Sequence, residues 1–311
     1  MARYTAPSDY PVQHPILTGV LAQMVADAAR EEGRRETAFP TLARYSDAGK
    51  CARAIGLTSL LDEGQIDDQA DEDVAGQFRM WIGKILHEHV MGAIVATYGG
   101  EVEVPSYLGA YKGPTGDVMA LEAGHADWVG VVASASDLGR ITYELKTEGS
   151  FGFDKAIGVN RKTYTRDIPH GPRASTKIQG AMNAVANDAD TLILGSIAMD
   201  AISVGLAEKL QMSAFDRICA EWRYSRAEFA PWAKDEMARA QFIAEQLNDG
   251  MLPDRVAIGD EMEPVALDPT KVQSDTGVPK QWQCAYCRLR RVCVEIGPGP
   301  VQLAGVRGVT C

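Results

Sequence analysis

Carboxylate and lysine side chains that could act on a phosphodiester lie in two neighbouring segments of the chain. Asp127 belongs to the first, and Glu144 and Lys146 stand two residues apart in the second. Alternate residues of a β-strand share a face, so a strand here would place Glu144 and Lys146 together. Divalent cations prefer carboxylate oxygens and can activate water for phosphodiester hydrolysis. If Asp127 projects to the same side, this chemistry is indicated; the alternative is a solvated strand face with paired charges.

A histidine one helical turn after a glycine could supply a further metal ligand. Apolar residues recur at helical spacing over residues 74–98, which predicts a helix there. Gly83 and His87 lie on one face of it, outside the apolar stripe. A glycine inside a helix costs about 1 kcal/mol relative to alanine, so we expect another element to approach closely there. Without Asp127 and Glu144, His87 would be interpreted as a structural residue.

Four of the six cysteines have the spacing of a metal centre. Cys284, Cys287 and Cys293 lie within ten residues of one another, and Cys51 is the candidate fourth ligand. Four thiolates suit tetrahedral zinc or an iron–sulphur cluster. One distant cysteine with a C-terminal trio favours the cluster, because zinc ligands usually come as two close pairs. The alternative is a buried thiol at Cys51 and a partial zinc knuckle.

Helices and strands in a set order must position these groups. Strands are predicted at 102–108, 125–133, 140–147 and 191–198, and helices at 16–29, after Cys51, and at 174–189 and 226–248. Residues 260–280 have the composition of a surface linker. The order describes one mixed sheet flanked by helices. We divide this single α/β domain into an N-terminal helical region (1–73), a core (74–225) and a C-terminal cysteine-rich region (226–311).

The charge balance limits how the chain could bind nucleic acid. Its 311 residues include 31 Lys and Arg against 42 Asp and Glu, for a net charge of −11, so DNA would need a local basic surface. Basic residues interleaved with a ring suit a groove that follows phosphates and stacks on a base. The candidates are Arg161, Lys162, Tyr164, Arg166, Arg173 and Lys177. The alternative is a solvated loop and helix face.

Location and the two remaining cysteines complete the expectations from composition. No stretch approaches the roughly 18 apolar residues of a membrane span, and the first residues lack the pattern of a secretory leader. We expect a cytoplasmic protein with no membrane partner and with reduced thiols. Cys219 is expected in the core, at helical spacing from Phe215 and Ile218, and Cys311 has no evident partner.

Taken in order, these residues resemble the PD-(D/E)XK nuclease superfamily. Within it they are similar to the RecB-like exonucleases with an iron–sulphur cluster, including CRISPR-associated and phage forms. The resemblance runs from Cys51 to Cys293. It rests on a G-x-x-x-H helix at Gly83 and His87, the strand Asp127, the E-x-K of Glu144 and Lys146, the four cysteines, and a G-x-L-P segment at residues 250–253.

The resemblance implies roles for individual residues. It implies that Mg²⁺ or Mn²⁺ is bound by His87, Asp127, Glu144 and the backbone carbonyl of Leu145. Lys146 would assist the attacking water, and Gln179 would position Lys146 or DNA. The family's tyrosine four residues after that glutamine is Asn183 here, so its DNA-positioning role is not carried over. Cys51, Cys284, Cys287 and Cys293 would hold a 4Fe-4S cluster that joins the N-terminal and C-terminal regions.

The function implied is a metal-dependent DNA exonuclease acting on single strands or DNA ends. Its setting would be recombination, repair, phage DNA metabolism or CRISPR spacer acquisition, in a bacterial or phage-infected cell, with recombination or CRISPR-adaptation proteins as partners. Two other classes stay open: a DNA-end-binding module that does not cut, and a zinc-containing DNA-binding regulator. Polarity of digestion, strand preference and oligomeric state are not predicted.

Overall fold

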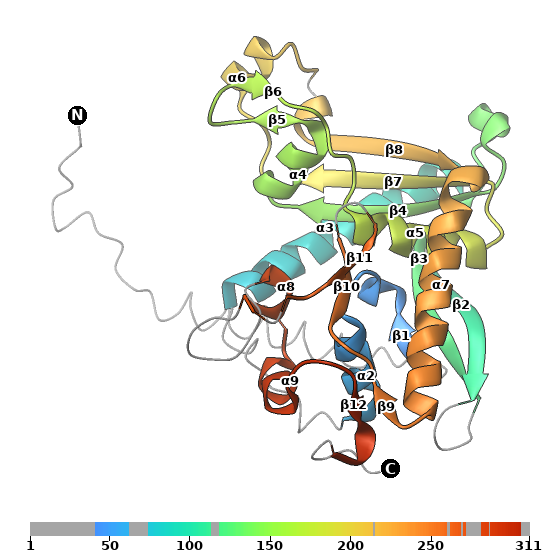
Figure 1. Ribbon diagram of the computed structural model, residues 1–311. Helices are drawn as coiled ribbons and strands as arrows, with labels where there is room; N and C mark the ends of the chain where they lie inside the picture. The colour runs from blue at the N-terminus through green and yellow to red at the C-terminus, as the bar shows by residue number, and fades with distance from the viewer. Residues whose placement is uncertain are drawn as a thin grey trace, which may run out of the picture.

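The computed structural model describes residues 41–61, 74–112, 118–213, 215–259, 262–268, 270–271, 281–285 and 287–305. The predicted helix at 16–29 and Cys311 lie outside these ranges. A six-stranded mixed sheet forms the centre (Figure 1). Its main path runs β1 (Thr41–Arg44), β3 (Val118–Gly130), β4 (Ile141–Glu148), β7 (Thr191–Ala198) and β8 (Cys219–Ser225), and β2 (Glu101–Lys112) pairs with β3. The β1–β3 and β4–β7 pairs are parallel, and the other pairs are antiparallel.

One edge of β3 is only partly covered. β1 pairs with residues 120–123 of β3, whereas β4 pairs with residues 128–130. β2 runs along the opposite edge from residue 118 to residue 129, so β1 and β4 must share the remaining edge. Among the described strands, residues 124–127 therefore have no partner on that edge. We call these four residues the β3 gap, and the candidate catalytic side chains meet beside it.

Helices cover both faces of the sheet. On β4, Leu145 shares a hydrophobic cluster with Met91 of α3 (Val74–Tyr98). The adjacent Glu144 faces α5 (Ala174–Ala186) instead, so α3 and α5 lie on opposite faces. α7 (Arg226–Asn248) packs against α5 in a second cluster that contains Ile178 and Phe229. This three-layer arrangement gives the sheet two helical faces from which side chains can reach the β3 gap.

The C-terminal segment packs against α2 (Ala52–Leu60). Leu57 of α2, Leu247 of α7 and Leu289 share one hydrophobic cluster. The short elements of this region are β9 (Met251–Leu252) paired with β12 (Val301–Gln302), β10 (Val256–Ile258) paired with β11 (Pro264–Ala266), α8 (Trp282–Ala285) and α9 (Arg290–Ile296). The segment that carries the cysteine trio therefore lies beside the helix that follows Cys51 (Figure 1).

The remaining elements lie at the β4–β7 end of the sheet or in connections. They are α4 (Ser150–Ile157), β5 (Val159–Asn160), β6 (Thr165–Arg166), α6 (Val204–Lys209), and 3-10 turns at Tyr45–Asp47, Ala133–Leu138, Phe215–Arg217 and Leu303–Gly305. The predicted elements at 74–98, 191–198 and 226–248 are confirmed with these bounds. The helix predicted at 174–189 ends at Ala186. The three-part division of the chain stays a prediction.

The structure corrects two sequence predictions and describes part of a third segment. The strand predicted at 125–133 ends at Gly130, and β3 begins as early as Val118. Of the surface linker expected at 260–280, the structure describes residues 262–268 and 270–271, which include the exposed strand β11; the rest lies outside the described residues. Cys219 opens β8 and is half-buried, while Phe215 and Ile218 are 73% and 42% exposed, so these three residues do not form part of the core. The spacing of these three residues would fit one face of a helix, but Phe215 lies in a 3-10 turn and β8 begins at Cys219.

Candidate active site

Asp127 lies where β3 and β4 separate. The strands pair up to Trp128 and Tyr143, and the ladder stops before Asp127 and Glu144 would face each other. Oδ2 of Asp127 instead accepts a hydrogen bond from the backbone N–H of Leu145, at 2.6 Å. A side-chain oxygen thus replaces a strand carbonyl at the β3 gap. The contact fixes Asp127 beside the part of β4 that carries the other candidate catalytic residues.

α3 brings His87 to the same carboxylate. Nε2 of His87 lies 3.1 Å from Oδ2 of Asp127. This hydrogen bond raises the pKa of His87, although burial opposes the charged imidazole. The helix can approach because Gly83 faces Thr147: a Cβ atom on Gly83 would lie 2.5 Å from Oγ1 of Thr147. The close approach predicted at Gly83 is confirmed. The residue that Gly83 meets is Thr147, which follows Lys146 in β4.

Glu103 of β2 is a candidate metal ligand that the sequence analysis missed. Ligand atoms of His87, Glu103 and Asp127 all lie within 4.8 Å of one another. Glu103 has a φ of +50°, a left-handed conformation that is uncommon outside glycine. The neighbouring pairs Val102–Trp128 and Val104–Ala126 place Glu103 opposite Asp127. Only the register of β2 on β3 reveals this position, and the local sequence EVEV carries no signal of it.

Glu144 is fully buried, and three side chains hold its carboxylate. Oε1 accepts hydrogen bonds from Nζ of Lys146 and from Nε2 of Gln179, both at 2.6 Å. Oε2 accepts one from Nδ2 of Asn183 at 2.9 Å. Asn183 also donates to the carbonyl of His125 at 3.0 Å, which satisfies a backbone group of the β3 gap. Asn183 therefore holds the carboxylate of Glu144 and the backbone of the β3 gap in one arrangement.

Charged side chains of both signs lie close together in this site. Burial, and then the neighbouring Asp127, raise the pKa of Glu144 to about 7. Burial opposes the charge on Lys146, but Glu144 and Asp127 raise the pKa of Lys146 above its usual value. Lys146 therefore stays protonated and offsets one negative charge. The imidazole of His87 with the carboxylates of Glu103 and Asp127 is a donor set that suits Mg²⁺ or Mn²⁺.

The four cysteines form a second group, drawn from distant parts of the chain. Cys51 is the N-cap of α2, Cys284 lies in α8 and Cys293 in α9, and with Cys287 they line a cavity of about 1310 Å³. Burial, and then the other three thiols, raise the pKa of Cys284 to about 11. Among the residues that the structure describes, no three of these sulphurs lie within 4.8 Å of one another. Tetrahedral zinc holds its sulphurs about 3.8 Å apart.

Comparisons with known proteins found no matching family and no matching curated protein. Among solved structures, SSO0001 is similar with a TM-score of 0.47 and 17% identity, over 91% of this chain and 98% of that one. An alkaline exonuclease, LHK-Exo from Laribacter hongkongensis, is similar with a TM-score of 0.30 and 12% identity, over 77% of this chain and 84% of that one. Neither likeness reaches a TM-score of 0.5. The functional argument therefore rests on the site itself.

The residues predicted to contact DNA have different surroundings. Arg161 is committed to the fold, because its guanidinium donates to Asp154 at 2.5 Å and to Asp200 at 3.2 Å. Nζ of Lys177 lies 5.8 Å from the ring centre of Trp232, a distance typical of a cation–π contact. The exposed members of the set are Lys162, Tyr164, Arg166 and Arg173. A DNA contact stays a prediction for these residues, and Arg161 is the weakest candidate.

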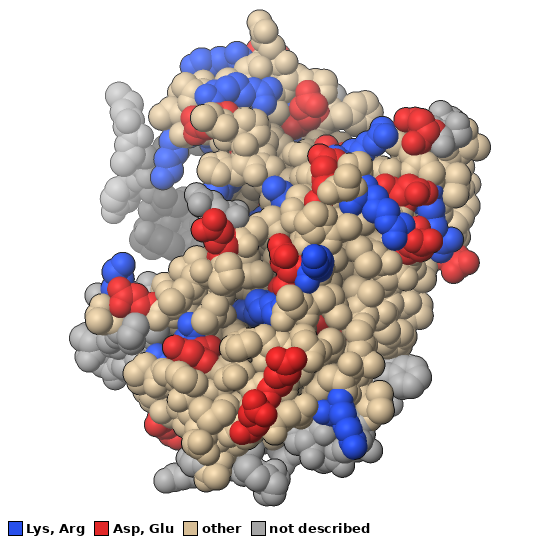
Figure 2. All heavy atoms as spheres, turned by 45° about the vertical axis from the view of Figure 1, so that its right-hand side comes forward, with Lys and Arg blue, Asp and Glu red and all other residues tan. Residues whose placement is uncertain are grey.

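The surface charge also bears on whether the chain could bind DNA. On the face that Figure 2 draws, acidic and basic side chains are interspersed over the surface. A basic surface for DNA would therefore have to be local, as the net charge of −11 also requires. No helix in the described ranges is both long enough and apolar enough to cross a membrane.

Proposed function

We propose that this chain is a divalent-metal-dependent deoxyribonuclease, an exonuclease that acts on single-stranded DNA or DNA ends. One observation supports the proposal above all: His87, Asp127, Glu144 and Lys146 come from three separate elements and meet beside the β3 gap. An imidazole, two carboxylates and an ammonium group are what metal-assisted phosphodiester hydrolysis requires. Paired charges on a solvated strand would not be buried in this way.

Each side chain has a role in the proposed reaction. His87, Glu103, Asp127, Glu144 and the carbonyl of Leu145 are the proposed ligands of Mg²⁺ or Mn²⁺, which when bound supplies an activated water and positive charge at the phosphate. Lys146 stays protonated and stabilises negative charge that develops on the phosphate oxygens. Gln179 and Asn183 hold Glu144 in one orientation, so the carboxylate needs little reorganisation during the reaction.

We propose in addition that the four cysteines hold a 4Fe-4S cluster with a structural role. The donor set of four thiols fits such a cluster, and among the described residues no three of their sulphurs lie within 4.8 Å of one another. The cluster would fasten α8 and α9 to α2 and so stabilise both regions. Brown protein with visible absorbance and iron after anaerobic purification supports this proposal; zinc without iron contradicts it.

End-labelled oligonucleotides test the nuclease proposal directly. Single-stranded and double-stranded substrates labelled at either end are incubated with Mg²⁺, Mn²⁺ or Ca²⁺, and products are followed over time. We expect progressive shortening from an end with Mg²⁺ or Mn²⁺, and none with the Lys146→Ala variant. Binding of DNA ends without shortening under every condition would contradict the proposal and favour the non-cutting module. The biological processes and protein partners expected from the sequence stay predictions.

A further inference from the structure

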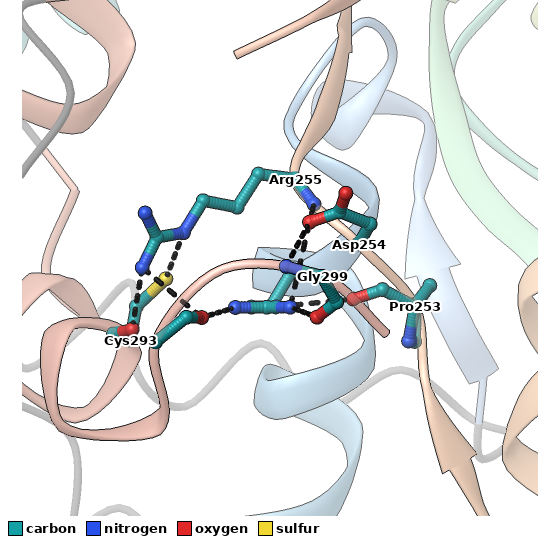
Figure 3. Close-up of polar contacts among 7 residues, drawn as sticks. Pro253, Asp254, Arg255, Cys293 and Gly299 are labelled. Atoms are coloured by element: carbon teal, nitrogen blue, oxygen red, sulfur yellow. Dashed lines mark hydrogen bonds and ion pairs between the residues drawn. The ribbon is translucent and has the colours of Figure 1, made fainter. Parts of the chain in front are cut away.

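Two arginines are buried beside the four cysteines. Arg53 lies two residues after Cys51 and is 0% exposed, and Arg255 lies just before β10 and is 4% exposed. Figure 3 shows Arg255 beside Cys293, with Pro253, Asp254 and Gly299 close by. Arginine keeps its charge in nearly every protein environment. Each of these guanidinium groups therefore needs a compensating negative charge.

Arg53 finds this compensation within the protein. Its Nε donates to the carbonyl of Pro253 at 3.0 Å, and its other nitrogens donate to the carbonyls of Gly297 and Gly299. A carboxylate lies close as well, because Oδ1 of Asp254 is 3.5 Å from the guanidinium. These contacts join α2 to the C-terminal segment. Arg53 is therefore a structural residue whose charge is paired.

Arg255 is different, because it contacts a sulphur. Its Nε donates to Sγ of Cys293 at 3.2 Å, and a terminal nitrogen donates to the carbonyl of Cys293 at 2.7 Å and to that of Gly297 at 3.3 Å (Figure 3). Asp254 is bound to the backbone N–H of Arg255. Within the part of the chain that the structure describes, no carboxylate forms an ion pair with this guanidinium.

A buried cation without an anion is strongly unfavourable. Carbonyl dipoles and a neutral thiol do not supply a full negative charge, but metal-bound thiolates do. Four thiolates on one centre would carry more negative charge than its metal ions neutralise. The positive charge of Arg255 and the excess negative charge of a centre with four thiolates would therefore compensate each other.

We propose that Arg255 is the counter-ion of the metal–sulphur centre and a positioning residue for the Cys293 thiolate. This inference rests on the proposed cluster. The guanidinium retains the centre, because its positive charge and its hydrogen bonds hold Cys293 in place as a ligand. It also raises the reduction potential of the cluster, because positive charge and an N–H···S bond favour the state with one more electron.

The test compares Arg255→Gln with wild type and with Arg291→Gln. Arg291 is exposed on the same helix as Cys293, so its substitution removes the same charge without the buried contact. Anaerobically purified proteins are treated with an iron chelator, and bleaching of the visible absorbance is timed. We expect Arg255→Gln to lose iron about 10-fold to 100-fold faster than wild type. Its reduction potential should shift to a lower value, while Arg291→Gln should match wild type in both measurements.

If Arg255→Gln does not fold, the same measurements are made on Arg255→Lys. Lysine retains the charge but cannot present the fork that binds Cys293 and Gly297, so iron loss should still be faster than in wild type. Wild-type rates of iron loss in the folded variants, with an unchanged potential, would overturn the inference. Wild-type protein that contains no iron would overturn the proposed cluster, and this is measured before any variant is compared.

Discussion

Gly83 of α3 and Thr147 of β4 lie in direct contact across the face of the sheet. A Cβ atom on Gly83 would stand 2.5 Å from Oγ1 of Thr147 but 3.6 Å from its Cβ. The contact sets how closely α3 approaches β4. Since His87 lies one helical turn further along, the same contact places its imidazole beside Asp127.

Gly83→Ala should push α3 away from β4 and lower the initial rate of DNA cleavage about tenfold or more, because ligand placement is sensitive to small shifts. Alanine favours a helix more than glycine does, so loss of the helix would not be the cause. Adding Thr147→Ala removes the oxygen at 2.5 Å and leaves an ordinary 3.6 Å contact, so the double variant should recover most of the rate. A double variant no faster than Gly83→Ala would contradict this account.

Lys146→Ala should reduce cleavage by about 100-fold or more, because the ammonium group that faces Glu144 at 2.6 Å is lost. The matched control is Lys234→Ala, which removes an exposed lysine of α7. Circular dichroism and iron content should match wild type in both proteins. Cleavage at the wild-type rate by Lys146→Ala would refute the role assigned to this residue.

Asn183→Leu should lower the free energy of unfolding by about 1–3 kcal/mol, because Glu144 loses a buried hydrogen-bond donor and the carbonyl of His125 loses a part-buried one. Chemical denaturation measures this change. Asn187→Ala is the comparison at the C-cap of the same helix; its Nδ2 donates to Oγ of Ser106 and to the carbonyl of Asn183, both neutral acceptors, so this substitution should cost less. Equal losses from the two substitutions would show that the contact with Glu144 is not special.

Glu103→Gln should weaken Mn²⁺ binding about tenfold, because one of three ligand atoms within 4.8 Å of one another loses its negative charge. Isothermal titration calorimetry with the metal alone measures the affinity. Glu101→Gln, an exposed change two residues away on β2, should bind Mn²⁺ as wild type does. If both variants bind like wild type, Glu103 is not a ligand.

Binding of Mn²⁺ should tighten as the pH rises from about 6 to about 8. The pKa of Glu144 is raised to about 7 by burial and by Asp127, so this carboxyl holds a proton below that pH and must release it to bind a cation. The raised pKa of His87 acts in the same direction. Titrations at three pH values measure the trend, and excess metal should move its midpoint to lower pH. Affinity independent of pH would contradict the prediction.

Local periodicity was sufficient to predict the groups that one element carries. The spacing of apolar residues predicted α3, with Gly83 and His87 on one face, and strand alternation placed Glu144 and Lys146 together. Such signals are read from neighbours in the sequence and need no knowledge of the partner element. The prediction that Gly83 meets another element followed from the cost of a mid-helix glycine alone.

Residues whose roles depend on the pairing of distant segments could not be predicted in this way. Glu103 reaches His87 only because β2 pairs with β3 in one register. Asn183 contacts Glu144 and His125 only because α5 covers the β3 gap. Arg255 meets Cys293 across 38 positions of sequence. β8 was missed because its polar and exposed residues give a weak strand pattern, which left Cys219 assigned to a helix face.

β1 ends at Arg44, and Cys51 follows only seven positions later. The strand that borders the open part of β3 is thus tied by a short tether to the sulphur-bearing end of the molecule. If the cysteines hold the proposed cluster, its loss would release the start of α2 and, through this connection, loosen β1 beside the β3 gap. Oxidation of the cluster would then lower the proposed nuclease activity without any change at the carboxylates.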